Sequence, residues 1–257
     1  MKVAIFDSGV GGLTVLYSAM KQMPYNDYIY YADLDNVPYG NKDKEMVNRL
    51  TSRAVEQIYD LGVDAIVLAC NTATSISADL LRGKYDIPII GMEPAVKPAL
   101  MNSFGKRVLV LATELTLKES KLRDLINRLE ATDKVDLLPM SELVDFAEEM
   151  VFESEPVRVL LDEKFRHIDL SVYKTVVLGC THFIYFKKTI EQYFNYSMDV
   201  IDGNMGTVNH LEKILMGINK GYNASHERKP IQYYISGKKA KASMFKGYMK
   251  YLEMLDT

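Results

Sequence analysis

Short apolar runs rich in β-branched and aromatic residues alternate along this chain with longer stretches of helical periodicity. The runs are VAIF (3–6), YIYYA (28–32), AIVLA (65–69), IPIIG (87–91), RVLVLA (107–112), VDLL (135–138), TVVLG (175–179) and MDVID (198–202). Between such runs, the stretch 118–131 places Leu122, Ile126 and Leu129 at helical spacing, and 13–23 is also amphipathic. Continuous apolar strands separated by helices are typical of a mostly parallel sheet covered on both faces. The sequence therefore predicts an α/β fold.

One short pattern occurs twice, as AIVLACNTA at 65–73 and as TVVLGCTHF at 175–183. The chain has only two cysteines, Cys70 and Cys180, which lie 180 − 70 = 110 residues apart. Each follows an apolar run and precedes a turn that contains threonine. Ligands of open α/β sheets bind beyond the carboxyl ends of the strands. We therefore expect both thiols to face one ligand-binding cleft, although buried cysteines are also common as plain core residues.

The repeated pattern favours two pseudo-symmetric domains, each a mostly parallel sheet flanked by helices, with the active site in the cleft between them. Residues 1–94 together with 209–257 would form the first domain, and 95–208 the second. The run IQYYIS at 231–236 is predicted to be an edge strand that rejoins the first sheet. The lysine-rich segment 237–250 that follows it is predicted to be a solvated amphipathic helix.

The bulk properties of the 257-residue chain exclude several classes of protein. A formal net charge of −3 argues against general nucleic-acid binding, which needs a basic surface. The start MKVAIFDSGVGG is too weakly apolar for a signal peptide, and no run is long enough to span a membrane. We expect a cytoplasmic protein whose cysteines need not form a disulfide. A metal site of Cys70, Cys180 and His182 is the weakest alternative, because the chain lacks paired-ligand spacing such as CxxC.

Two loops offer candidate ligand contacts. In FDSGVGGLTV (6–15) a strand ends at Asp7 and a glycine-rich turn leads into a helix. Free backbone N–H groups there would suit a small anion such as a carboxylate, although glycine could serve only the sterics of a tight turn. In YADLDNVPYGNK (31–42) the Tyr39 side chain could offer a hydroxyl. Neutral donors also follow the two cysteines, namely Asn71, Thr72, Thr181 and His182.

The acidic segment SELVDFAEEMVFESEP (141–156) has a helical apolar stripe, and most of its carboxylates fall off that stripe. A solvated helix face is therefore expected for most of them.

These motifs together resemble those of the glutamate racemases. The resemblance rests on FDSGVGGLTV, VPYGNK, ACNTA, IPIIG followed by Met-Glu-Pro, TELTLKES at 113–120 and LGCTH, which occur in that family's order and spacing. It covers residues 3 to about 202, and the tail from IQYYISG is similar too. The family interconverts L- and D-glutamate without a cofactor and supplies D-glutamate for bacterial peptidoglycan. The resemblance implies a small-molecule substrate, L- or D-glutamate. A homodimer is a separate expectation.

The resemblance also assigns roles to residues. Cys70 and Cys180 would be the two acid/base groups, assisted by Asp7 and His182. The implied substrate-binding residues are Asp7, Ser8, Tyr39, Gly40, Asn71, Thr72, Thr181 and His182. In many members a glutamate near residues 145–150 supports the second cysteine, and this chain offers Glu142, Asp145, Glu148 and Glu149 there.

A two-base mechanism would explain why cysteine occurs twice. Racemisation takes the α-proton from one face of the substrate and returns a proton to the other, which two groups on opposite sides do most simply. The base must be a thiolate, and a helix N-terminus or a cationic His182 would help a thiol to ionise. Asp7 would be the hydrogen-bond or proton partner of the other thiol. Oriented donors at the α-carboxylate, namely Asn71, Thr72 and Thr181, would stabilise the carbanion.

The chain departs from the family's usual motifs at Leu34, Asn41 and Gly203, and in Phe183-Ile184-Tyr185 after GCTH. Two alternatives therefore stay open. One is a racemase of aspartate or a related acidic substrate, against which CTH rather than CTE argues. The other is a binding or regulatory protein that kept the fold and lost turnover.

Overall fold

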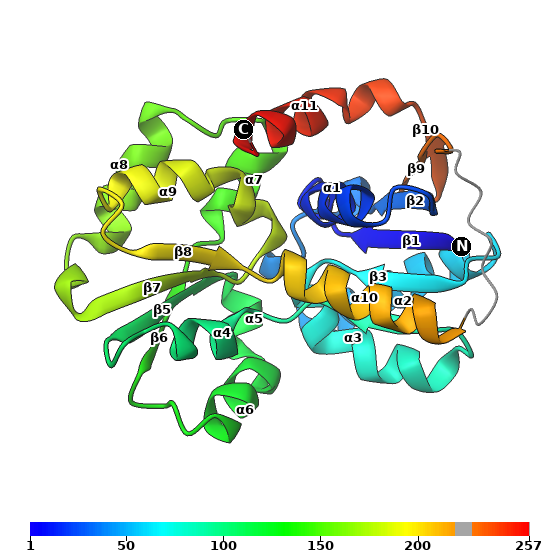
Figure 1. Ribbon diagram of the computed structural model, residues 1–257. Coiled ribbons are helices and arrows are strands. Elements are labelled where there is room, and N and C mark those ends of the chain that lie inside the picture. The colour runs from blue at the N-terminus through cyan, green and yellow to red at the C-terminus, as the bar shows by residue number, and fades with distance from the viewer. Residues whose placement is uncertain (219–227, 257) are drawn as a thin grey trace.

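The computed structural model describes residues 1–218 and 228–256, which form two sheets with helices packed against them (Figure 1). The strands of the first sheet are β1 (Lys2–Asp7), β2 (Asp27–Ala32), β3 (Ala65–Leu68), β4 (Ile89–Gly91), β9 (Gln232–Ile235) and β10 (Lys238–Ala240). Those of the second are β5 (Arg107–Ala112), β6 (Val135–Pro139), β7 (Tyr173–Leu178) and β8 (Asp199–Asp202). Each of the eight apolar runs predicted as strands is confirmed.

The first sheet has the order β10-β9-β2-β1-β3-β4, and the second has the order β6-β5-β7-β8. All neighbouring strands are parallel except β9 and β10, which are antiparallel. In the first sheet Phe6 of β1 lies opposite Leu68 of β3, so both strands end at the same edge. The prediction of an α/β fold with mostly parallel sheets is therefore confirmed.

Helices connect and cover these strands. The α-helices are α1 (Leu13–Gln22), α2 (Lys44–Tyr59), α3 (Asn71–Lys84), α4 (Val96–Met101), α5 (Glu114–Lys118), α6 (Ser120–Arg128), α7 (Glu142–Glu148), α8 (Glu155–Phe165), α9 (Lys187–Tyr193), α10 (Asn204–Ile218) and α11 (Lys246–Leu255). The 3₁₀ segments are η1 (Leu34–Asn36), η2 (Tyr39–Asn41), η3 (Leu170–Val172), η4 (Thr181–Phe186) and η5 (Ala242–Met244).

The helix predicted at 118–131 is shorter than expected. Lys118 is the last residue of α5, and Glu119 has an extended backbone with ψ 146° that separates α5 from α6. Within α6, Leu122 and Ile126 are buried as their spacing predicts. The helix predicted at 13–23 matches α1 to within one residue.

The prediction for the tail was wrong in two respects. β9 pairs with β2 on one side and β10 on the other, so the edge strand is β10. Ser236 (φ 45°) and Gly237 (φ 89°) form a tight turn with two left-handed residues, which is the turn that β-hairpins favour. Lys238–Ala240 is therefore a strand, and the predicted helix begins only at Lys246.

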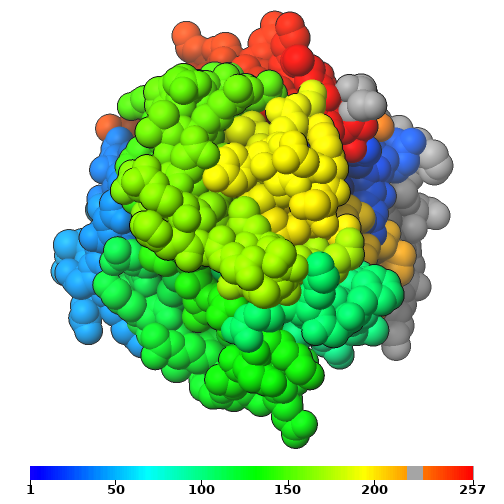
Figure 2. All heavy atoms as spheres, turned by 90° about the vertical axis from the view of Figure 1, so that its left-hand side faces the viewer, coloured from blue at the N-terminus to red at the C-terminus, as the bar shows by residue number. Residues whose placement is uncertain are grey.

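Helix α11 returns from the edge of the first sheet across α1 toward α7 (Figure 1). From the side of the second sheet, it lies at the top of a surface built mainly by residues 120–200 (Figure 2). One cluster of buried apolar side chains joins β1 of the first sheet, through Val3 and Ile5, to β7 of the second, through Val176 and Leu178. The division into domains at 94/95 and 208/209 stays a prediction. Within the described residues, no helix has both the length and the apolar character needed to cross a bilayer.

Candidate active site

The two cysteines lie just beyond the carboxyl ends of β3 and β7, one strand from each sheet. Both are free thiols, and Cys70 is 6% and Cys180 7% exposed. A hydrogen bond links the end of β1 to the segment after β7, because the Thr181 hydroxyl donates to Asp7 Oδ2 at 3.0 Å. The thiols are close enough for the charge of Cys180 to raise the pKa of Cys70. The site thus brings the repeated motifs together.

Cys70 is the N-cap residue of α3. Its Sγ accepts a hydrogen bond from the Ala73 N–H at 3.4 Å and lies 3.6 Å from Ser8 Oγ. Burial raises the pKa of Cys70 to about 12, and the charge of Asp7 contributes further in the same direction. The contacts with Ala73 and Ser8 oppose this rise without cancelling it. Cys70 is therefore a protonated thiol at neutral pH.

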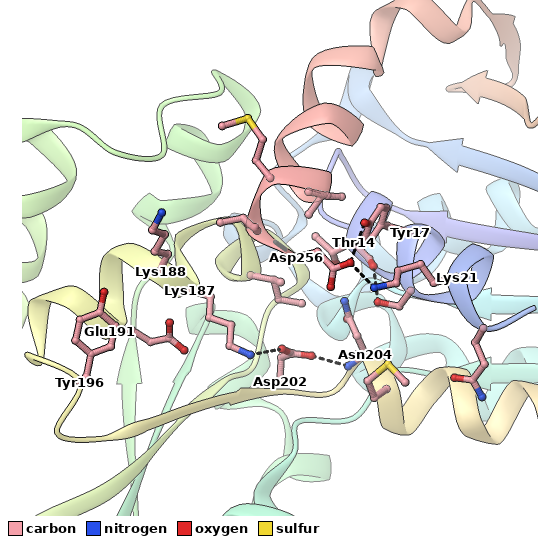
Figure 3. Close-up of a pocket in the computed structure, with 17 residues that line it drawn as sticks. Thr14, Tyr17, Lys21, Lys187, Lys188, Glu191, Tyr196, Asp202, Asn204 and Asp256 are labelled. Carbon is pink, nitrogen blue, oxygen red and sulfur yellow. Dashed lines mark hydrogen bonds and ion pairs between the residues drawn. The ribbon is translucent and has the colours of Figure 1, made fainter.

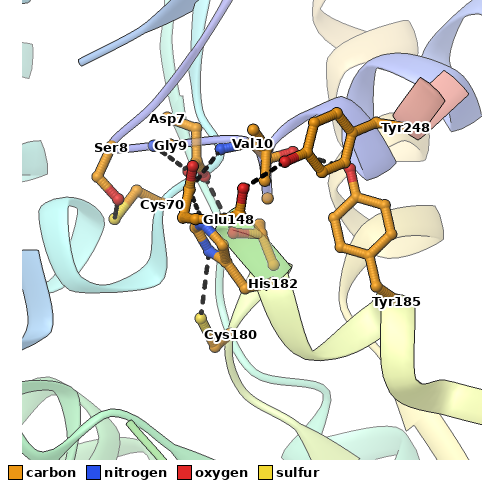
Figure 4. A network of polar contacts seen from close by, with 12 residues as sticks. Asp7, Ser8, Gly9, Val10, Cys70, Glu148, Cys180, His182, Tyr185 and Tyr248 are labelled. Atoms are coloured by element: carbon orange, nitrogen blue, oxygen red, sulfur yellow. Dashed lines mark hydrogen bonds and ion pairs between the residues drawn. The ribbon is translucent and has the colours of Figure 1, made fainter. Parts of the chain in front are cut away.

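Cys180 has a different neighbour. Its Sγ lies 3.8 Å from His182 Nδ1, and the other ring nitrogen, Nε2, lies 2.7 Å from Glu148 Oε1 (Figure 4). Burial lowers the pKa of His182, but the contacts with Cys180 and Glu148 outweigh burial and raise it well above its usual value. The imidazole is therefore a cation that donates toward both neighbours. A cation beside Sγ favours the thiolate form of a cysteine.

The glycine-rich turn after β1 contacts the protein's own carboxylates. The Gly9 N–H donates to Asp7 Oδ1 at 2.9 Å, and the Val10 N–H donates to Glu148 Oε1 at 2.8 Å. A Cβ at Gly9 would lie 1.8 Å from Glu148 Oε1, so glycine is required for close approach. The anions that the backbone N–H groups of this turn bind are the carboxylates of Asp7 and Glu148. At Gly9, a side chain would be too close to Glu148.

Asp7 lies at the centre of this arrangement and is fully buried. Burial raises the pKa of its carboxyl group, and the His182 cation partly offsets that rise. Its two oxygens accept hydrogen bonds from Gly9 and Thr181. The charge of Asp7 is one of the causes that raise the pKa of Cys70.

The predicted residues of the neighbouring loops are also buried here. The Tyr39 hydroxyl donates its hydrogen bond to Asp33 Oδ2 at 2.7 Å, within the protein itself. A Cβ at Gly40 would lie 2.7 Å from Thr113 Cβ, which shows how closely η2 approaches the second sheet. Asn71 begins α3 and is 5% exposed.

Thr72 belongs to a triangle of buried hydroxyl groups. Its Oγ1 lies 3.1 Å from Thr113 Oγ1 and 3.0 Å from Thr116 Oγ1, which are 3.0 Å from each other. Thr113 is also the N-cap of α5, where its hydroxyl accepts from the Thr116 N–H. Sequence reasoning quoted TELTLKES only as part of the resemblance and missed these two threonines. The T-x-x-T spacing at a helix start was the available signal.

Comparisons with known proteins decide the family. The family model described as Asp/Glu/Hydantoin racemase matches residues 17–211. The chain belongs to this racemase family. A glutamate racemase of Halothermothrix orenii is 48% identical over 257 residues, which are 99% of this chain and 99% of that protein. Glutamate racemase 2 of Bacillus subtilis is 44% identical over 259 residues, covering 100% of this chain and 97% of that protein. The resemblance seen in the motifs is therefore confirmed.

A solved structure agrees with these sequence matches. The crystal structure of Escherichia coli glutamate racemase in complex with L-glutamate and the activator UDP-MurNAc-ala superposes with a TM-score of 0.81 at 28% identity. The superposition covers 97% of this chain and 94% of that one. As a member of the racemase family, the chain is an isomerase with the two-sheet fold of its relatives.

Among the four acidic residues that the sequence left open in this racemase, Glu148 is the one that contacts His182, the neighbour of the second cysteine. Glu148 contacts His182 and the turn after β1, whereas Glu142 forms an ion pair with Lys164. Asp145 and Glu149 are exposed. Most of the segment's carboxylates are therefore solvated as predicted, and Glu148 is the exception.

A separate groove of about 790 Å³ lies between α1, α9, α11 and the start of α10 (Figure 3). Lys21 pairs with Asp256, and Lys187 pairs with Asp202 at 3.6 Å. None of the predicted site residues lines this groove. Within the described residues, no group of three or more metal-ligating side chains has the arrangement of a metal site.

Proposed function

We propose that this chain interconverts L- and D-glutamate without a cofactor, with Cys70 and Cys180 acting on opposite faces of the substrate's α-carbon. The observation that carries the proposal is that two buried free thiols, one from each sheet, converge on a site tied together by Thr181 and Asp7. Relatives that are 44% and 48% identical over nearly the whole chain are glutamate racemases.

The different surroundings of the thiols support different resting roles for them. Cys180, beside the His182 cation, takes the α-proton as a thiolate, while Cys70 holds a proton that it gives to the opposite face. The α-carbon loses one proton and gains one, and the two cysteines exchange their protonation states. For the other enantiomer the roles reverse, so Cys70 must then be the base. Ser8 and the Ala73 N–H support its thiolate.

The substrate's carboxylates need neutral donors, because the acidic residues of the site would repel them. Asn71, Thr72 and Thr181 lie next to the cysteines in the chain and would hold the α-carboxylate, stabilising the carbanion. Ser8, Tyr39 and Gly40 would face the side-chain carboxylate. Asp7 and His182 would contact both the thiols and the substrate.

The burial of both thiols predicts a conformational change. Both cysteines are less than a tenth exposed, so we expect the two sheets to open for substrate entry and to close during proton transfer. Equal hydrogen-exchange protection with and without glutamate would count against such closure. A cytoplasmic location, a homodimer and supply of D-glutamate to peptidoglycan synthesis also stay predictions.

Proton-exchange NMR in D₂O tests the proposal. The wild type should exchange the α-proton of both glutamate enantiomers and racemise them, and Cys70→Ser and Cys180→Ser should each lose racemisation by about a thousandfold. Exchange of aspartate instead would reassign the substrate. Binding of glutamate without any exchange would indicate a protein that kept the fold and lost turnover.

A further inference from the structure

The segment η4 presents two side chains to the same part of the glycine-rich turn. In a 3₁₀ helix, residues three apart lie on the same face, which places Tyr185 beside His182. His182 approaches Gly9 and Gly11, where an added Cβ would lie 2.9 and 2.4 Å from its ring nitrogens. The Tyr185 hydroxyl donates to the Val10 carbonyl at 2.9 Å.

Tyr185 is rigidly held. It is fully buried and stacks on Phe152 with ring centroids 4.9 Å apart and an interplanar angle of 16°. Its ring also packs 5.8 Å from that of Tyr248 of α11, whose hydroxyl donates to the Glu148 carbonyl at 2.6 Å (Figure 4). A stacked aromatic ring of this kind fixes the direction of its hydroxyl group.

The Tyr185 contact continues to the catalytic thiol through a series of hydrogen bonds. Val10, whose carbonyl accepts from Tyr185, donates its N–H to Glu148 Oε1 at 2.8 Å. The same carboxylate oxygen lies 2.7 Å from His182 Nε2. His182 Nδ1 then faces Cys180 Sγ at 3.8 Å. Tyr185 is thus connected to Cys180 in two ways. One is the backbone of η4, and the other is the series of hydrogen bonds through Val10, Glu148 and His182.

We propose that Tyr185 is a positioning residue for the racemase reaction, because its hydroxyl fixes the turn that holds Glu148 against His182. This inference rests on the proposed function for its catalytic consequence, although the positioning itself can be measured without substrate. The Tyr30 hydroxyl also contacts this turn, because it donates to the Gly9 carbonyl at 2.6 Å.

The Tyr185→Phe variant isolates the hydroxyl, since phenylalanine keeps the stack on Phe152. Tyr28→Phe is the matched control, because Tyr28 is also buried and also donates to backbone carbonyls, those of Ala19 and Met23, away from the cysteines. Both variants lose a buried hydrogen bond, so both should melt at a similarly lower temperature. Only Tyr185→Phe should disturb His182.

The first readout is the titration of His182 by NMR of protein with ¹³C-labelled histidine, with the signal assigned by its absence in His182→Gln. The charged and titratable groups that face His182 are Cys180 after β7, Glu148 and Asp145 of α7, and Asp7 of β1. Weaker contact with Glu148 should lower the pKa of His182, moving the midpoint down by about half a pH unit in Tyr185→Phe. In Tyr28→Phe the midpoint should not move.

The second readout is a double-mutant cycle on kcat. Tyr185→Phe should lower kcat about fivefold with little change in KM, the loss expected for one hydrogen bond. In a Glu148→Gln background it should cost almost nothing further, because both changes act through the same contact. Tyr28→Phe should leave kcat unchanged.

An unchanged His182 titration, or losses that multiply in the double variant, would overturn the proposal. If Tyr185→Phe does not fold, Tyr30→Phe takes its place in both measurements. The NMR titration uses no substrate, so it separates a failed positioning role from a failed assignment of glutamate as the substrate.

Discussion

Cys70 and Cys180 occupy matching positions in the sequence and different surroundings in the structure. Cys70 caps α3, and its Sγ has hydrogen-bond contacts with two neutral groups, the Ser8 hydroxyl and the Ala73 N–H. Cys180 precedes a 3₁₀ segment and faces the His182 cation. The nearest carboxylates also differ, because Asp7 raises the pKa of Cys70, whereas Glu148 sustains the charge of His182.

This difference shows that a repeated motif can place two thiols in unlike surroundings. Two thiols of equal acidity would leave the resting enzyme with no defined base and no defined acid. In the proposed mechanism, the imidazolium beside Cys180 and the burial of Cys70 near a carboxylate would give the two thiols different roles. The surroundings of the two thiols, and not the repeated motif, would then assign the base and the acid.

Among the contacts that distinguish the two thiols, removing the charge of Glu148 should have the largest effect. Glu148→Gln keeps an oxygen that can accept from Val10 but loses the negative charge that stabilises the His182 cation. Charged hydrogen bonds are worth about 2 kcal/mol, so kcat should fall about thirtyfold. Steady-state racemisation, followed by circular dichroism, would measure this loss.

Glu149→Gln is the control for that measurement. Glu149 adjoins Glu148 at the end of α7 and is exposed. It should change kcat by less than about twofold, since exposed charges contribute little. Equal losses in the two variants would mean that general negative charge, and not the contact with His182, supports Cys180.

A smaller effect, the pH dependence of the free energy of unfolding, should distinguish the two cysteines. The pKa of Cys70 is raised from 9.0 to about 12, mainly by burial. Between these values the unfolded chain releases the proton while the folded protein keeps it, so the stability present below about pH 9 is lost as pH rises. The free energy of unfolding of the wild type should therefore fall by about 1.4 kcal/mol between about pH 8 and about pH 10 from this group.

Urea unfolding of the reduced protein at the two pH values would measure this change. Cys70→Ser should lack this part of the pH dependence, while Cys180→Ser should retain it. If Cys70→Ser lost stability with pH as steeply as the wild type, the thiol of Cys70 would not be the titrating group.

Much of this arrangement could be predicted from the sequence. The continuous apolar runs defined the strands, and the repeated pattern around Cys70 and Cys180 correctly placed both thiols at strand ends. The tail was misread because lysines at 238–241 suggested a solvated helix. The Ser236-Gly237 pair, a turn signal, was the better guide to the hairpin.

The contacts around the thiols could not be predicted in the same way. Glu148 lies 34 residues before His182 in the chain, and only the packing of α7 against η4 brings them together. Tyr185 belongs to a departure from the family's motif, and the sequence does not show that its hydroxyl reaches the Val10 carbonyl. Side-chain pairs between distant segments depend on tertiary packing, which local periodicity does not encode.

The smallest expected effect concerns the neutral neighbour of Cys70, the Ser8 hydroxyl. Ser8 lies 3.6 Å from Cys70 Sγ, and this contact opposes the rise in the pKa of Cys70. Ser8→Ala should make the thiolate of Cys70 harder to form, and a weak hydrogen bond of this kind corresponds to about a threefold loss. The loss should be larger in kcat for the enantiomer whose proton Cys70 removes.

Alkylation by iodoacetamide in a Cys180→Ser background isolates Cys70, because the chain then has one thiol. With Ser8→Ala, the pH at which alkylation reaches half its maximal rate should move upward. Ser75→Ala is the control, since Ser75 donates to the Asn71 carbonyl on the same helix without touching Cys70. If both alanine variants moved the curve equally, the effect would come from loosening α3. If only Ser8→Ala moved it, neutral donors would be what makes Cys70 usable as a base, in contrast to the cation that serves Cys180.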